Sequence, residues 1–241
     1  MCPPTAFRAR LRLLLIVVNI TSAIFTASAP DLDVCPDESL PEFAFIGRSN
    51  VGKSSLLNLL AGQAGLARVS PTPGFTKLLN FFTINQTWRL VDLPGYGFAE
   101  GAKKDSARFN QAVARYLKHR TNLCLVFALI DSGLEPQPMD VEFVEWLTRH
   151  AVPFVLVFTK TDKEPPAVVQ ANIAAFMARI AGWFAQPPAT FTCSAAEERG
   201  RQELLGVIDE NLAAIRAAAR AVGGPAPAPP RKPRPDRARP W

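Results

Sequence analysis

Short apolar runs alternate with amphipathic stretches along most of the 241-residue chain. The apolar runs have the length of β-strands, and the unbroken ones are typical of strands buried on both faces of a parallel sheet. Asn85-Gln86 alone separates two of these runs, which favours a tight hairpin. The pattern predicts six strands, at 43–46, 78–84, 87–91, 123–130, 153–158 and 189–193.

Helical periodicity occupies the intervals between these strands. In the last such interval, apolar side chains from Leu204 to Ile215 repeat at the spacing of one helix face. The predicted helices cover 54–60, 105–119, 138–150, 166–182 and 201–220. Strands that alternate with helices predict an α/β fold, here a mostly parallel six-stranded sheet with one antiparallel edge strand and helices on both faces.

The loop between the first strand and the first helix carries a phosphate-binding motif. Gly47-Arg-Ser-Asn-Val-Gly-Lys-Ser54 fits Gly-x-x-x-x-Gly-Lys-Ser/Thr, the P-loop. Its glycines let the backbone approach an anion, and N–H groups at the helix N-terminus then point at that anion. We expect Lys53 to reach the β- and γ-phosphates of a nucleotide and the Ser54 hydroxyl to ligate Mg²⁺. A chance glycine-rich turn is the alternative, and the strand–loop–helix context disfavours it.

Two further motifs stand at the ends of predicted strands, where ligands bind in open α/β sheets. Asp92 opens Asp-Leu-Pro-Gly95, and we expect its carboxylate to hold Mg²⁺ through water while the Gly95 N–H contacts the γ-phosphate. Taken alone, this stretch is also an ordinary turn sequence.

The second of these motifs, Thr159-Lys-Thr-Asp162, indicates which base is bound. A carboxylate at Asp162 can accept hydrogen bonds from N1 and the exocyclic amine of guanine, a pair of donors that adenine lacks. Lys160 can lay its aliphatic stem over the purine face. Ser194-Ala195, after the last strand, is expected to complete the base pocket with a backbone N–H.

Together these motifs resemble a translation-factor-class (TRAFAC) GTPase, and in detail they are similar to the EngB (YihA/YsxC) family over about residues 22–215. The resemblance implies a Ras-like GTPase fold and a slow GTPase with a role in assembling the large ribosomal subunit, and hence in cell division and growth. It rests on Gly47–Ser54, Thr72-Pro-Gly-Phe-Thr76, Leu78-Leu-Asn-Phe-Phe82, Asp92-Leu-Pro-Gly-Tyr-Gly97 and Thr159-Lys-Thr-Asp-Lys163.

The resemblance also implies Thr76 as the switch residue that ligates Mg²⁺, with Thr72 as a weaker substitute. Family members usually carry Arg or Lys where this chain has Phe75. Tyr96 occupies the place of the glutamine that orients water in Ras-like enzymes, so we expect slow intrinsic hydrolysis that a partner accelerates. Asn50 stands where potassium-stimulated relatives coordinate K⁺, which makes K⁺ a second cofactor hypothesis.

The residues expected to contact GTP come from five separated segments. They are Gly47, Arg48, Ser49, Asn50, Val51, Gly52, Lys53, Ser54, Ser55, Pro73, Gly74, Phe75, Thr76, Asp92, Leu93, Pro94, Gly95, Thr159, Lys160, Thr161, Asp162, Cys193, Ser194 and Ala195. The expected Mg²⁺ ligands are Ser54, Thr76 and, through water, Asp92. No catalytic base is identified, and Lys53 and Thr76 are the candidates for a transition-state or switch role.

Charge lies mainly at the two ends of the chain, whose net charge is +6. Residues 1–30 carry three arginines and no acid, and residues 225–241 carry five basic residues and one acid. Basic tails favour polyanions such as RNA, with a solubilising tail as the equal alternative. Cys124 and Cys193 lie in apolar runs, and none of the four cysteines forms a Cys-x-x-Cys pair, so we expect buried thiols in a reducing compartment.

The ends also suggest the domain limits. Arg8, Arg10 and Arg12, a short apolar stretch and then Ala27-Ser28-Ala29 resemble a signal peptide. An exported GTPase would lack its nucleotide, so a wrongly assigned start, or a leader packed on the domain, is preferred. The Pro/Arg-rich end lacks an apolar period and is expected to be disordered. The hypothesis is a leader at 1–21, a G domain at 22–222 and a basic tail at 223–241.

Three other readings stay open at this stage. An ATP-using P-loop enzyme would show no preference for guanine, and a non-catalytic GTP-gated scaffold would bind RNA or the ribosome without stimulated turnover. An exported or membrane-anchored protein rests on residues 8–29 alone. The preferred reading is a monomeric cytoplasmic protein without a membrane partner, which binds GTP or GDP and the precursor of the large ribosomal subunit with its rRNA and proteins.

Overall fold

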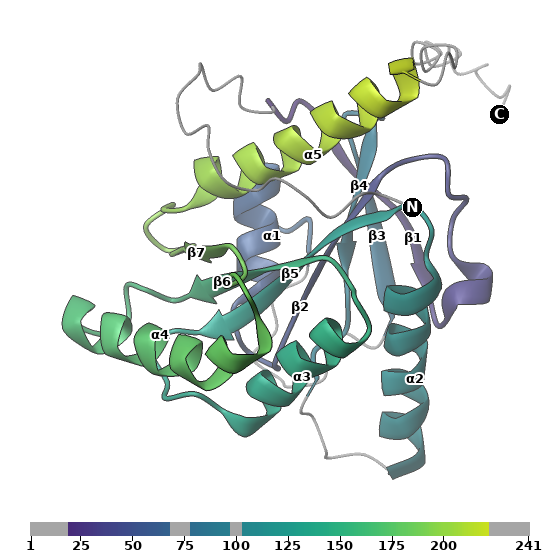
Figure 1. Cartoon of the computed structure of the whole chain (residues 1–241). Coiled ribbons are helices and arrows are strands. Elements are labelled where there is room, and N and C mark those ends of the chain that lie inside the picture. The colour runs from purple at the N-terminus through teal and green to yellow at the C-terminus, as the bar shows by residue number, and fades with distance from the viewer. Residues whose placement is uncertain (1–18, 68–77, 97–102, 222–241) are drawn as a thin grey trace, which may run out of the picture.

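The computed structural model describes residues 19–67, 78–96 and 103–221, and the side chains of 103–110 are not described. Within these ranges a single sheet is covered by helices on both faces (Figure 1). The strands are β1 Ala23–Ala29, β2 Glu42–Gly47, β3 Leu79–Ile84, β4 Trp88–Asp92, β5 Leu123–Asp131, β6 Phe154–Thr159 and β7 Thr190–Thr192. The helices are α1 Lys53–Ala61, α2 Lys103–His119, α3 Pro138–Arg149, α4 Pro166–Ile180 and α5 Arg201–Ala221, with short 3₁₀ turns at Leu32–Val34 and Ala181–Trp183.

The strand order across the sheet is β1-β3-β4-β2-β5-β6-β7. The five strands from β4 to β7 in this order pair in parallel, and β3 pairs antiparallel with both β4 and β1. The β3–β4 hairpin turns at Asn85 and Gln86, which have φ of 48° and 56°. Positive φ at both central residues matches the twist of a two-residue hairpin, so the predicted tight turn is confirmed.

The predicted α/β class is confirmed, but the described sheet has seven strands rather than six. The additional strand, β1, pairs with β3 from Ala23 to Ala29 and forms the edge. The antiparallel strand β3 is therefore internal, whereas the sequence predicted that the antiparallel strand lies at the edge of the sheet. The prediction missed β1 because it lies at an edge, mostly exposed, and its small residues resemble a signal-peptide cleavage site.

Cleavage at that site would disrupt the sheet. Ala29, the last residue of the signal-like motif, is fully buried and pairs with Leu79. The Asn85 side chain also holds the start of β1: its Oδ1 accepts from the backbone N–H groups of Thr21 at 2.8 Å and Ser22 at 3.1 Å. Residues 23–29 therefore belong to the folded domain.

Two apolar cores lie on opposite faces of the sheet. Alternation along β2 sends Phe43 and Phe45 to the face covered by α1 and α5, and Ala44 and Ile46 to the face covered by α2, α3 and α4. Figure 1 shows α5 running across one side of the sheet and α2 to α4 on the other. Burial on both faces explains why the central strands are apolar throughout. Within the described ranges, none of the helices is long and apolar enough to cross a membrane.

Candidate functional site

The P-loop leaves the sheet at the end of β2 and leads directly into α1. Gly47 lies so close to β5 that a Cβ there would stand 2.6 Å from the carbonyl oxygen of Leu129, so only glycine fits without a shift. Asn50 and Gly52 have positive φ, 64° and 99°, which curls the loop backbone. The loop then ends at Lys53, the first residue of α1, and the helix N-terminus faces the loop.

Lys53 connects the P-loop to the Asp-x-x-Gly segment. Its side chain is largely buried, and its ammonium group pairs with the buried carboxylate of Asp92 at the end of β4. The two residues are 39 positions apart in the chain. The structure thus brings the expected phosphate-binding lysine and the expected Mg²⁺ aspartate together at the carboxyl ends of the parallel strands.

The residues that follow Asp92 lie along the P-loop backbone. The Ser49 N–H donates to the Tyr96 carbonyl at 3.2 Å, and Arg48 and Tyr96 form a parallel β-bridge. A Cβ at Gly95 would stand 3.0 Å from the Gly47 carbonyl oxygen, so a larger residue would push the two segments apart. Gly95 is therefore seated directly against the loop that is expected to hold the phosphates.

Thr159 and Lys160 join the base motif to the same loop. The Thr159 hydroxyl donates to the Val51 carbonyl at 2.6 Å. Lys160 has a φ of 59°, and its stem carbons Cγ and Cε lie 4.0 and 3.9 Å from the Cβ position of Gly52. Its ammonium group pairs with Asp131 at 2.7 Å. The lysine stem therefore runs along the P-loop, as expected of a residue that covers a purine bound beside it.

Asp162 is held from the loop after β7. The buried Ser194 hydroxyl donates to its Oδ1 at 2.6 Å, and this bond is the main reason that the pKa of Asp162 lies below its usual value. The Thr161 N–H donates to the Cys193 carbonyl at 3.3 Å, which ties the two loops together. Burial raises the pKa of the Cys193 thiol to about 12. At neutral pH Asp162 is consequently an anion, whereas Cys193 is an unreactive thiol that contributes backbone contacts.

The structure reveals two carboxylates beside this edge that sequence reasoning missed. Asp131, the last residue of β5, pairs with Lys160, and Asp140, in the first turn of α3, lies 3.4 Å from Arg48 Nε. The position of Asp131 at a strand end was a usable signal, because ligand-site residues gather there. Asp140 carried no such signal, because an acidic residue in a first helical turn is common for electrostatic reasons alone.

The predicted switch residues lie outside the part of the chain that the structure describes. Thr72, Pro73, Gly74, Phe75 and Thr76 fall in 68–77, outside the described residues. The other predicted residues lie at the end of β2, in the P-loop and in α1, at the end of β4 and just after it, at the end of β6 and in the loop that follows, and in the loop after β7. The structure gathers them at the carboxyl ends of the parallel strands, and their contact with a nucleotide stays a prediction.

The oxygen ligands present suit a hard cation. The Ser54 hydroxyl lies in the first turn of α1, next to Lys53, and Lys53 in turn contacts the buried Asp92 carboxylate. A hydroxyl, a carboxylate and phosphate oxygens form a donor set typical of Mg²⁺, which keeps several of its waters. The described part of the site therefore fits Mg²⁺, and the assignment of Ser54 as a direct ligand and Asp92 as a ligand through water stays a prediction.

A P-loop between strand and helix, an Asp-x-x-Gly segment against it and a Thr-Lys-x-Asp motif on the same edge define a Ras-like P-loop GTPase. A family model described as "50S ribosome-binding GTPase" matches residues 42–160. "Probable GTP-binding protein EngB" of Phocaeicola vulgatus is 44% identical over 83% of this chain and 100% of its own length. Its counterpart in a Bacteroides fragilis strain is 45% identical over 80% of this chain and 96% of its own. The chain belongs to the EngB family of GTP-binding proteins.

Solved structures agree on the fold. A crystal structure of a probable GTP-binding protein engB has a TM-score of 0.59 and 24% identity, and covers 71% of this chain and 98% of its own. The structure of Era with MgGDPNP and a segment of 16S ribosomal RNA has a TM-score of 0.57 and 22% identity, covering 71% of this chain and 56% of Era. These similarities support the Ras-like arrangement of the sheet and helices.

Proposed function

We propose that this protein is a slow GTPase that acts as a nucleotide switch in the assembly of the large ribosomal subunit. One observation carries the nucleotide part of the proposal: the phosphate-binding loop and the base motif form one continuous edge, joined by Thr159 and by the stem of Lys160. The ribosomal part is supported by the family description, which names binding to the 50S ribosome.

Each residue on this edge has a distinct role toward GTP. The P-loop N–H groups and Lys53 neutralise the phosphates, which requires Lys53 to exchange its contact with Asp92 for one with phosphate oxygen. Asp162 accepts two hydrogen bonds from guanine, and Lys160, held by Asp131, covers the base. Mg²⁺, when bound, neutralises charge on the phosphate oxygens.

Slow intrinsic hydrolysis follows from Tyr96. Its ring packs on Phe143 with centroids 4.5 Å apart, and its hydroxyl lies beside the Asp140 carboxylate. Burial raises its pKa well above the usual value, so the phenol is neutral and cannot accept a proton from water. Without a glutamine at this position, we expect a turnover no faster than the ~10⁻⁴–10⁻³ per second of unassisted Ras.

The proposal is tested by co-sedimentation of the protein with separated ribosomal subunits, in GDP or in a non-hydrolysable GTP analogue. We expect binding to the large subunit with the analogue and several-fold less with GDP. Lys53→Ala is the control, because it removes the phosphate contact and should abolish the nucleotide dependence. Equal binding in both nucleotides, or binding only to the small subunit, would contradict the switch.

The rate of GTP hydrolysis, measured in the same mixtures, distinguishes the GTPase switch from a non-catalytic scaffold. A non-catalytic GTP-gated scaffold would bind the subunit with the analogue, yet ribosomes would not stimulate its hydrolysis of GTP.

We further propose a monomeric, cytoplasmic protein needed for normal cell division. K⁺ coordination by Asn50 remains a hypothesis, which equal turnover in KCl and NaCl would refute.

A further inference from the structure

Three segments of the chain converge on one buried carboxylate beside the P-loop. Asp140 is 1% exposed, and its Oδ1 lies 3.4 Å from Nε of Arg48, the second residue of the P-loop motif. The Tyr96 hydroxyl lies beside the same carboxylate and acts to lower its pKa. Within the described residues, neither Arg48 Nε nor Asp140 Oδ1 has a hydrogen-bond partner. These two atoms therefore interact with each other through the ion pair alone.

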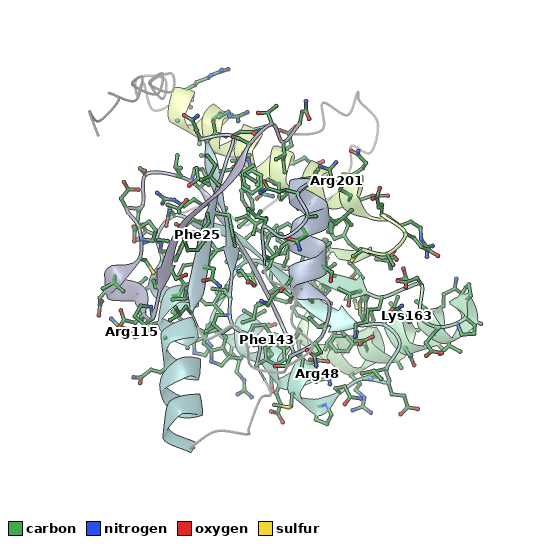
Figure 2. The ribbon with its side chains drawn as sticks, turned by 180° about the vertical axis from the view of Figure 1, so that it is seen from behind. Phe25, Arg48, Arg115, Phe143, Lys163 and Arg201 are labelled. Carbon is green, nitrogen blue, oxygen red and sulfur yellow. The ribbon has the colours of Figure 1, made fainter. Side chains whose placement is uncertain are left out.

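Tyr96 is fixed from both sides in this arrangement. Its backbone is bridged to Arg48 and accepts from the Ser49 N–H, and its ring packs on Phe143 of α3. Figure 2 shows Arg48 and Phe143 close together at the lower end of the sheet. Gly95, the residue before Tyr96, is thereby kept against the P-loop, with its Cβ position 3.0 Å from the Gly47 carbonyl oxygen.

Packing alone does not explain a carboxylate at position 140. Removing a carboxylate from water is costly, and an apolar side chain of similar volume often serves a purely structural contact as well or better. Burial raises the pKa of Asp140, whereas Arg48 and the Tyr96 hydroxyl act to lower it. Asp140 also lies in the first turn of α3, where the helix dipole favours an anion. The carboxylate is thus stabilised by the very groups that it connects.

We propose that Asp140 is a positioning residue that, through Arg48 and Tyr96, holds Gly95 against the P-loop, ready to receive a γ-phosphate. This rests on the proposed function as a GTP-dependent switch. GDP has no γ-phosphate and does not use the Gly95 N–H. Loss of the contact therefore weakens binding of GTP more than binding of GDP, and the ratio of the two affinities depends on α3.

The test is calorimetric binding of GDP and of a non-hydrolysable GTP analogue to Asp140→Asn and Tyr96→Phe. We expect each variant to bind the analogue about tenfold more weakly, the effect of one hydrogen bond to a charged group. GDP affinity should change by less than about twofold. The double variant should lose no more than the stronger single variant, because both remove one shared contact. Glu142→Gln removes the same charge from an exposed site on α3 and should change neither affinity.

A second readout follows α3 itself. In the unmodified protein, amide hydrogen exchange in residues 138–149 should be slower with the analogue than with GDP, and this difference should vanish in both variants. Thermal unfolding monitors folding, and Tyr96→Phe, which keeps the ring on Phe143, carries the test if Asp140→Asn does not fold.

Two results would overturn the inference. Equal weakening for GDP and the analogue would make Asp140 a structural support of the P-loop, and unchanged affinities would remove its role altogether. Nucleotide binding by the unmodified protein distinguishes failure of this inference from failure of the proposed function. If it binds neither nucleotide, both ideas fall, whereas if it binds both with a preference that the variants keep, only the inference falls.

Discussion

At the scale of single residues, Asp162 shows how neighbouring groups prepare a site for its ligand. Ser194 donates to Oδ1 at 2.6 Å, and the Lys163 ammonium lies 3.6 Å from Oδ2. Both contacts lower the pKa of the carboxyl group. The carboxylate is therefore an anion and an acceptor on both oxygens at neutral pH, which is the state that the two donors of guanine require.

Asp162→Asn should transfer the base preference from guanine to xanthine. The amide presents a donor where guanine also presents one, whereas xanthine carries a carbonyl oxygen there. We expect GDP affinity to fall by about 100-fold or more and xanthosine diphosphate affinity to rise, both measured by calorimetry. Ser194→Ala, which keeps the carboxylate, is the control and should retain the preference for GDP. Parallel losses for the two nucleotides would show that Asp162 does not read the base.

At the scale of elements, a buried polar network ties β2, β4 and α2 together. Glu42, the first residue of β2, accepts from the Tyr116 hydroxyl and from Arg120 Nε, both at 2.9 Å, and from Arg120 Nη2 at 2.7 Å. Nη1 of Arg89, in β4, lies 3.4 Å from Oε1 of Glu42. Gly47, at the other end of β2, begins the P-loop. The network is therefore at the end of the strand opposite to the nucleotide site.

Glu42→Gln should destabilise the fold without affecting the site. It leaves two buried guanidinium groups without their shared anion, and breaking a buried pair in this way costs about 3–5 kcal/mol. Asp33→Asn, which breaks the exposed Asp33–Arg115 pair, is the control and should cost about 0–1 kcal/mol. Urea unfolding measures both changes, and GDP affinity of the folded Glu42→Gln protein should be unchanged. Equal costs for the two variants would refute the role of the network.

At the scale of the whole molecule, β1 extends the sheet beyond the strands that carry the site. It covers the edge of β3, where the Phe25 ring lies edge-on to Phe82 with centroids 5.8 Å apart. Phe25 itself remains 53% exposed, whereas Phe82 is 3% exposed. None of the strands that lead into the P-loop, Asp92 or the base motif pairs with β1. Stability and nucleotide binding are therefore separable at this edge.

Removal of residues 1–29 should lower stability and leave GDP binding intact. The truncation exposes Phe82 and the β3 edge, and re-exposing one large apolar side chain costs about 1.5–3 kcal/mol. Urea unfolding and GDP calorimetry on the truncated and full-length chains measure the two effects. Unchanged stability would mean that β1 contributes little, and loss of GDP binding would mean that the edge strand supports the site.

Much of the fold was predictable because its signals are local. The apolar runs of β2, β5 and β6 and the Asn85-Gln86 hairpin depend on neighbouring residues only, and each appears where it was predicted. β1 was not predictable in this way, because its two large apolar residues, Ile24 and Phe25, stay more than half exposed at the sheet edge, and its buried residue, Ala29, is small. Its place follows from the partner strand β3, which begins 50 residues beyond the end of β1.

The candidate site likewise has parts that local sequence predicts and contacts that depend on the tertiary structure. Sequence alone determined the phosphate motif, the Asp-x-x-Gly segment and the base motif, because each works through residues that are contiguous in the chain. Only the tertiary structure decided that Lys160 pairs with Asp131, and that Asp140 lies beside both Arg48 and Tyr96. These partners stand on different elements, and they meet only because the strand order and the packing of α3 fix which elements become neighbours.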